Sequence, residues 1–106
     1  MSEVLSIAPA DVMDKVNHGA YLVDIRDLNS YQLSHIKKST RLDNETLPTF
    51  LLEADMDKPV IVCCYHGVSS IQAAGFLAQQ GFDEVYSLTG GFTAYSFSHP
   101  EHCNSL

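Results

Sequence analysis

The sequence has few basic residues, no long apolar run and no even set of cysteines. Six Lys and Arg stand against thirteen Asp and Glu among 106 residues, which gives a net charge of -7. Such an acidic balance repels phosphate backbones and anionic lipid surfaces, so nucleic acid and membranes are disfavoured as partners. The longest apolar run, from Val60 to Tyr65, is far shorter than the roughly 18 residues that a membrane span needs.

Cysteine is also scarce, and its arrangement does not suit disulfides. Three cysteines are present, and two of them, Cys63 and Cys64, are adjacent. An odd number with a neighbouring pair makes a poor disulfide framework, so we expect free thiols in a reducing compartment. The opening Met1, Ser2 and Glu3 show neither the basic region nor the apolar core of a secretory signal. We therefore expect a cytoplasmic protein.

Short apolar segments alternate with helix-like segments, and we interpret residues 1–106 as one domain. The pattern predicts strands over 5–7, 21–25, 40–42, 59–64 and 84–88, and helices around 12–16, 30–34, 46–53, 69–80 and 92–98, with Asn44 as the cap of the third helix. Nearly apolar strands separated by helices indicate an α/β fold, with a central, mostly parallel sheet and helices on both faces.

The segment from about residue 99 is polar, and we expect it to be a flexible tail. It carries His99, His102 and Cys103. A metal site there lacks a fourth ligand and a rigid frame, so we predict no metal in this protein.

Ligands of parallel sheets bind beyond the carboxyl ends of the strands. Cys64 lies at the end of the most apolar strand, and Asp24 and Arg26 lie at the end of another. Strand alternation places Asp24 and Arg26 on one face, where we expect a structural ion pair. The same alternation turns Cys63 away from Cys64 and into the core.

Cys64 is the candidate nucleophile because it stands between that strand and a turn that opens a helix. Amides at a helix start have no partner within the helix, and the helix dipole adds positive character there. Free thiols titrate near pH ~8.5, whereas thiols in such places titrate at roughly 3.5 to 7.5. We therefore expect a reactive thiolate.

The turn after Cys64 supplies the expected surroundings of its sulfur. We expect inward-facing amides to bind the anion, and Gly67 to allow the necessary positive φ. A serine hydroxyl here either donates to the sulfur or caps the helix, and we favour capping for one of the two. His66 either tunes the thiolate or is simply solvated. The candidate binding residues are Tyr65, His66, Gly67, Val68, Ser69 and Ser70.

The segment CYHGVSS, residues 64–70, resembles the active-site loop of the rhodanese family of sulfurtransferases, and most closely that of its single-domain thiosulfate sulfurtransferases. Residues 22–27 resemble the first family signature, His35 and Ile36 the second, and residues 90–92 the glycine turn before the last helix. Lys38 and Ser39 replace the usual glycine and alanine of the second signature, and Tyr95 replaces a tryptophan. The resemblance covers about residues 7–95.

The resemblance implies a thiosulfate sulfurtransferase. In that activity Cys64 takes the outer sulfur of thiosulfate, releases sulfite and becomes a persulfide, which passes its sulfur to cyanide or a thiol. The implied acceptors are cyanide, small dithiols or a thioredoxin-like protein. No metal or organic cofactor is implied.

Other functions fit the loop less well. A cysteine-dependent phosphatase would need an arginine to grip phosphate, and Ser70 occupies the position where the family resemblance would place it. A protease-like pair of Cys64 with His35 lacks an orienting group, so we expect His35 to be structural. A non-catalytic sulfur carrier or binding module stays open as the alternative.

A basic stretch is the remaining candidate feature. It contains four of the six basic residues of the chain: Arg26, Lys37, Lys38 and Arg41. These residues either attract thiosulfate or an acidic protein acceptor, or form a solvated basic face. The sequence does not separate the two roles.

Overall fold

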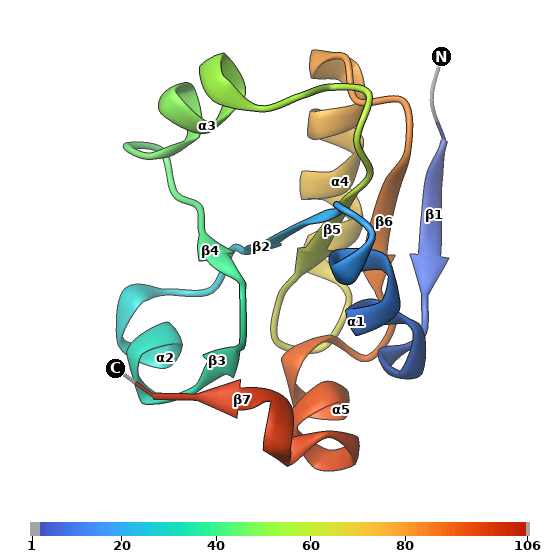
Figure 1. Ribbon diagram of the computed structural model, residues 1–106. Coiled ribbons are helices and arrows are strands. Elements are labelled where there is room, and N and C mark those ends of the chain that lie inside the picture. Colours follow the sequence, from blue (N-terminus) through green and yellow to red (C-terminus); the bar gives the residue numbers. More distant parts are fainter. Residues whose placement is uncertain (1–2, 106) are drawn as a thin grey trace.

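A parallel five-stranded sheet lies at the centre of the computed structural model, which describes residues 3–105 (Figure 1). The strands lie in the order β1-β6-β5-β2-β4, and every neighbouring pair is parallel. They are β1 (Val4–Ile7), β2 (Tyr21–Asp24), β4 (Thr40–Arg41), β5 (Val60–Cys63) and β6 (Val85–Leu88). The mostly parallel α/β sheet expected from the sequence is therefore confirmed.

Helices cover both faces of this sheet, and each face has its own apolar core. One core joins α1 (Pro9–Asn17) and α5 (Gly91–Ser98) to Leu22 and Ile61 of the sheet. The other joins α3 (Leu47–Glu53) and α4 (Ser69–Gln80) to sheet residues such as Val23. Adjacent strand residues thus belong to opposite cores, because side chains alternate along a strand. Burial on both faces explains why these strands are apolar throughout.

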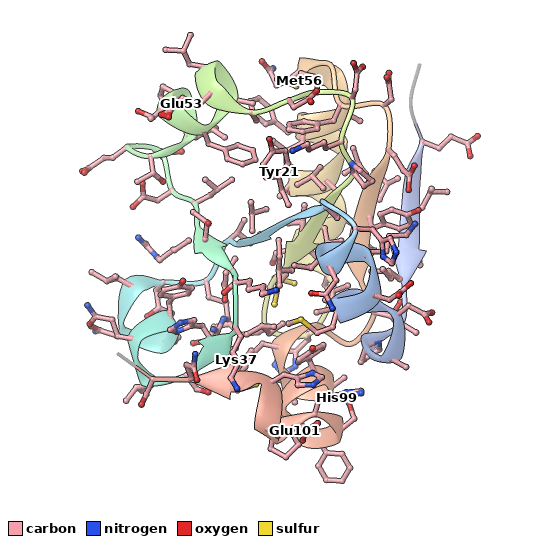
Figure 2. The ribbon with its side chains drawn as sticks, in the orientation of Figure 1. Tyr21, Lys37, Glu53, Met56, His99 and Glu101 are labelled. Carbon is pink, nitrogen blue, oxygen red and sulfur yellow. The ribbon has the colours of Figure 1, made fainter. Side chains whose placement is uncertain are left out.

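The polar end of the chain is the clearest departure from the sequence-based prediction. Instead of a flexible tail, residues 100–102 form a 3₁₀ turn, and β7 (Cys103–Asn104) pairs antiparallel with β3 (His35–Ile36). The amide of Lys37 donates to the His102 carbonyl over 2.7 Å, and the Tyr95 hydroxyl lies 2.9 Å from His102 Nδ1. Figure 2 shows Lys37, His99 and Glu101 at this end of the molecule. A pairing of two residues leaves no periodic signal in the sequence.

The start of α3 is a smaller correction. Asn44 was expected to cap this helix, but the Asp43 side chain accepts from the amides of Glu45 and Thr46 over 2.9 Å each. Either side chain suits such a turn, because both carry an oxygen that can accept from backbone amides. The predicted range of α4 agrees with the structure, and Gly81 ends it with a φ of 124°.

Helix α2 (Leu28–Leu33) connects β2 to β3 and is capped by Asp27, which accepts from the Ser30 amide. Among residues 3–105, none of the helices has the length and apolar character that crossing a bilayer requires.

Candidate active site

The carboxyl ends of β2, β5 and β6 lie at the same edge of the sheet because these strands are parallel neighbours, and in Figure 1 β5 and β6 point downward at this edge. Cys64 directly follows β5, Arg26 follows β2, and Gly90 and Gly91 follow β6. The loop from β5 to α4 lies beside the start of α5 in the same view. Side chains from separate parts of the sequence therefore meet at one site, as expected for a parallel sheet.

The first turn of helix α5 binds the Cys64 loop through two backbone hydrogen bonds. The amide of Phe92 donates to the Cys64 carbonyl over 2.7 Å, and the amide of Thr93 donates to the Tyr65 carbonyl over 3.0 Å. These amides belong to the first turn of α5, where they have no partner within the helix. Both carbonyls are thus bound to α5, while the amides of Gly67 and Ser70, further along the loop, donate to the Cys64 sulfur.

Two glycines permit this close packing of loop and helix. Gly67 has a φ of 87°, and a Cβ there would lie 2.8 Å from the Gly90 nitrogen. Gly91 has a φ of 62°, and a Cβ there would lie 2.5 Å from the Tyr65 carbonyl oxygen. Side chains are disfavoured at both positions by the backbone conformation and by lack of space.

The Cys64 sulfur lies among hydrogen-bond donors. The amide nitrogens of Gly67 and Ser70 lie 3.1 and 3.3 Å from Sγ, and the Ser70 hydroxyl lies 3.2 Å from it. Cys64 is only 4% exposed, so these bonds act where water screens them little. The arrangement stabilises negative charge on the sulfur.

The pKa of the Cys64 thiol is accordingly lowered. Burial is the largest single influence and raises this pKa, but hydrogen bonds from the Ser70 hydroxyl and from the amides of Ser70, Gly67 and His66 together outweigh it. The neighbouring thiol shows the opposite behaviour, since burial raises the pKa of Cys63 well above its usual value. Cys63 is fully buried in the apolar core, as alternation predicted.

Among the loop side chains, Ser70 alone is hydrogen-bonded to Sγ. The side chains of His66, Val68 and Ser69 are exposed, and the Tyr65 hydroxyl donates to Asp27 Oδ1 over 3.2 Å. Helix α4 begins without a side-chain cap, so the capping role favoured for one serine was wrong. The Ser70 amide instead donates to Cys64 Sγ, and the Ser70 hydroxyl shares a hydrogen bond with Sγ in which it accepts from the thiol and donates to the thiolate. Ser70 is placed for this because, as part of the first helical turn, it faces inward and is fully buried.

Arg26 forms a buried ion pair with Asp24, which confirms the expected structural role. Its Nη2 lies 2.8 Å from Asp24 Oδ2, and a further bond of 2.7 Å runs to the Ser34 carbonyl. The guanidinium also lies over the Phe92 ring, 3.9 Å from its centroid. Arg26 is therefore already bound within the protein and anchors the edge beside the cysteine loop.

Two other members of the basic stretch also have partners. Arg41 Nη1 lies 2.8 Å from Asp43 Oδ2, and Lys38 Nζ lies 3.1 Å from Asn17 Oδ1.

His35 Nδ1 lies 2.8 Å from the Tyr31 carbonyl and its ring stacks on the Tyr31 ring, so this histidine has the structural role expected of it. Within residues 3–105, no group of three or more His, Cys, Asp or Glu side chains is placed to hold a metal ion.

Ser87 of β6 is a site residue that sequence reasoning missed. Its hydroxyl lies 2.7 Å from the Ser70 hydroxyl, and the residue is 4% exposed. The available signal was a polar residue within the otherwise apolar end of a central strand, which requires a partner when buried.

The model of the Rhodanese-like domain family matches residues 8–98 of this chain. The chain belongs to the rhodanese family. A thiosulfate sulfurtransferase GlpE from Ectopseudomonas mendocina (strain ymp) is 50% identical, with 94% of this chain and 92% of the relative covered. The GlpE protein of Stutzerimonas stutzeri (strain A1501) is 48% identical over the same shares. The resemblance recognised from residues 64–70 is thereby confirmed.

Solved rhodanese structures share the fold. The chain aligns with reduced Bacillus anthracis CoADR-RHD at a TM-score of 0.81 and 29% identity, covering 94% of this chain and 18% of that one. The rhodanese-like domain of the Anabaena sp. Alr3790 protein gives a TM-score of 0.81 at 19% identity, with 95% and 79% covered. The rhodanese-like fold predicted from the sequence is confirmed.

Proposed function

We propose that this chain is a thiosulfate sulfurtransferase that works through a persulfide on Cys64. The Cys64 thiolate attacks the outer sulfur of thiosulfate, the new S–S bond forms, and the old S–S bond breaks with its electron pair leaving on sulfite. A thiol or cyanide then attacks the outer sulfur of the persulfide. Cys64 leaves as the thiolate again, and the acceptor carries the sulfur away as a persulfide or as thiocyanate.

The observation that carries this proposal is the set of donors at Sγ. The amides of Gly67 and Ser70 and the Ser70 hydroxyl lie within 3.3 Å of the sulfur. They are fixed before the reaction begins, so they stabilise the thiolate both as nucleophile and as leaving group without reorganisation. The names of relatives that are 48–50% identical support the same activity.

The rest of the loop faces the entering substrate. Tyr65, His66, Val68 and Ser69 are exposed in the loop, and we assign them to the substrate-binding rim. Gly67 and the buried Ser70 take part in the site through their hydrogen bonds to the sulfur. Capture of the thiosulfate dianion has to work against the net charge of -7. Because Arg26 and Arg41 are engaged by Asp24 and Asp43, binding relies on the loop amides rather than on a free arginine.

The experiment that tests this function is intact-protein mass spectrometry of the reduced protein after treatment with thiosulfate. We expect one added sulfur atom, which cyanide removes with formation of thiocyanate. The Cys64→Ser protein is expected to gain no sulfur, whereas Cys103→Ser serves as the matched control and should gain it normally. Sulfite release by Cys64→Ser at the wild-type rate would overturn the assignment of Cys64.

The same measurement separates the proposed enzyme from the alternatives. Persulfide formation without turnover on cyanide or small dithiols would identify a sulfur carrier. Hydrolysis of a phosphate monoester without any added sulfur would identify a phosphatase, although the arginine that such an enzyme needs is replaced by the fully buried Ser70.

The proposal also includes the molecule that accepts sulfur from the Cys64 persulfide. We assign it to cyanide, a small dithiol or the thiol of a thioredoxin-like protein. Exposed apolar side chains in the loop and in the following first turn of α4 support a protein acceptor, with Val68 74% and Ile71 54% exposed. A cytoplasmic location suits the three free cysteines, since a reducing compartment keeps the thiol available.

A further inference from the structure

Ser87 connects the central sheet to the Cys64 sulfur through one intervening hydroxyl. Its Oγ lies 2.7 Å from Ser70 Oγ, which lies 3.2 Å from Cys64 Sγ. Ser87 is held on β6, whose register places it opposite Val62 of β5. Both serines are buried, at 4% and 0% exposure, so water competes little for their hydrogen bonds.

The Ser87 hydroxyl, the Ser70 hydroxyl and the Cys64 sulfur form a row joined by two contacts. Counting the hydrogens in this row shows which charge state of the sulfur it favours. Each serine hydroxyl has one hydrogen to donate. When Cys64 is a thiolate, Ser87 donates to Ser70 and Ser70 donates to the sulfur, so both hydrogens are used. When Cys64 is a thiol, the row holds a third hydrogen for the same two contacts, and one donor has no partner within the row.

We propose that Ser87 is a positioning residue that fixes the Ser70 hydroxyl as a donor to the Cys64 sulfur. By donating to Ser70 Oγ, Ser87 occupies an acceptor site of that oxygen and directs the Ser70 hydrogen toward Sγ. The donation also polarises the Ser70 hydroxyl, which strengthens its bond to an anion.

The role in catalysis rests on the proposed function and concerns the second transfer step. In a persulfide the negative charge lies on the outer sulfur, and Sγ is a neutral bridging atom. Charge returns to Sγ only as the acceptor removes the outer sulfur and Cys64 leaves. The Ser87 and Ser70 hydroxyls therefore assist departure of the thiolate, and loss of Ser87 slows sulfur transfer to the acceptor.

The pKa of the Cys64 thiol tests the positioning role independently of turnover. It is read from the pH dependence of alkylation by iodoacetamide, with the modified cysteine identified by peptide mass spectrometry. Cooperative strengthening of about 10–30% per bond predicts a small effect for Ser87→Ala, an about two-fold loss of thiolate at a pH below the pKa. Ser70→Ala removes the direct charge-assisted donor, and we expect an about ten-fold loss.

The decisive variant is the double substitution of Ser70→Ala with Ser87→Ala. If Ser87 acts only through the Ser70 hydroxyl, its removal has no further effect in the Ser70→Ala background, and the double variant has the thiol pKa of Ser70→Ala alone. Additive effects would overturn the proposal, and so would a Ser87→Ala protein with the wild-type thiol pKa. Ser6→Ala is the matched control, because Ser6 is the exposed register partner of Ser87 on β1.

Ser87→Thr and Ser87→Val form a second pair that does not depend on how well alanine is tolerated. The two side chains have nearly the same shape and both suit a strand, but only threonine keeps the hydroxyl. We expect a higher thiol pKa and slower sulfur transfer to cyanide in Ser87→Val than in Ser87→Thr, and equal values would contradict the proposal. If the wild-type protein gained no sulfur from thiosulfate, the proposed function would fail while the alkylation measurements still decided the role of Ser87.

Discussion

The amide nitrogen of Phe92 donates to the carbonyl oxygen of Cys64 over 2.7 Å. This bond joins the first turn of α5 to the residue that carries the candidate nucleophile. It fixes the Cys64 carbonyl against α5, and the neighbouring bond from the Thr93 amide fixes the Tyr65 carbonyl there over 3.0 Å. The donor set at the sulfur thus depends on how closely α5 approaches the loop.

Gly91→Ala is predicted to separate α5 from the loop. The added Cβ would lie 2.5 Å from the Tyr65 carbonyl oxygen, at a backbone φ of 62°. The left-handed conformation and the overpacking together predict a loss of at least about 2 kcal/mol in the free energy of unfolding. We also expect reduced sulfur gain from thiosulfate. Urea unfolding and intact-protein mass spectrometry measure the two effects.

Gly75→Ala is the control for that substitution. Gly75 lies inside α4, and its Cβ would meet only a Val4 methyl carbon at 3.9 Å. An alanine there should stabilise the helix by about 0.5–1 kcal/mol. Equal stability and equal sulfur gain in the Gly91→Ala and Gly75→Ala proteins would contradict the role given to Gly91.

The buried pair of Asp24 and Arg26 gives a second prediction. Both side chains are almost fully buried, and their charged atoms approach to 2.8 Å. Asp24→Asn leaves the guanidinium buried without its counter-charge, which predicts a loss of about 3–5 kcal/mol in unfolding free energy. Urea unfolding of this variant is compared with that of Glu84→Gln. Glu84 pairs with Lys15 at the surface, where a pair contributes about 0–1 kcal/mol, so similar losses in both variants would refute the prediction.

Lys38→Gly is predicted to stabilise the protein. Lys38 has a φ of 71° and precedes Ser39, whose amide closes a turn to the Ile36 carbonyl. A side chain in this conformation costs about 1–2 kcal/mol, and the greater freedom of glycine in the unfolded chain offsets about 0.5–1 kcal/mol of the gain. We expect a net gain of about 0.5–1 kcal/mol in urea unfolding and an unchanged rate of sulfur transfer. Lower stability of the variant would show that the exposed bond from Lys38 to Asn17 outweighs the backbone strain.

The turn at Lys38 also shows what could be predicted from the sequence. Glycine is usual in the family at this position because the backbone φ is positive there. The sequence alone shows that lysine replaces this glycine. The sheet and its helices were predictable because strands buried on both faces are apolar over their whole length, as in Val60–Cys63. Cys64 and its loop could be located because the sequence places a thiol between the end of an apolar strand and a turn that opens a helix.

The contacts that were not predicted are those with no periodic pattern. The pairing of β3 with β7 involves two residues on each side, too few for alternation to appear. Ser70 and Ser87 are 17 positions apart in the sequence and meet only because α4 packs on β6. Whether a serine caps a helix or donates to a sulfur depends on the side to which the first helical turn faces, and that is set by tertiary packing.

The lowered pKa of Cys64 predicts how its reactivity depends on pH. Hydrogen bonds from Ser70 and Gly67 hold this pKa below that of an ordinary free thiol, whereas burial raises the pKa of Cys63 and of Cys103. The alkylation rate of Cys64 should therefore rise and level off at lower pH than that of an unperturbed thiol, while Cys63 and Cys103, whose pKa values are raised, react more slowly over the same range. Residue-resolved mass spectrometry after timed alkylation measures all three thiols in one sample.

The free energy of unfolding should also depend on the titration of the Cys64 thiol. Because the folded-state pKa of Cys64 is lower than that of the unfolded chain, its thiolate adds to the free energy of unfolding above the unfolded-state pKa. This contribution is lost as the pH falls through the folded-state pKa. The difference in unfolding free energy between the wild-type protein and Cys64→Ser should therefore grow in favour of the wild type with rising pH. A difference that stayed constant across this range, or a Cys64 that reacted no faster than Cys103, would mean that the loop amides do not stabilise the anion in solution.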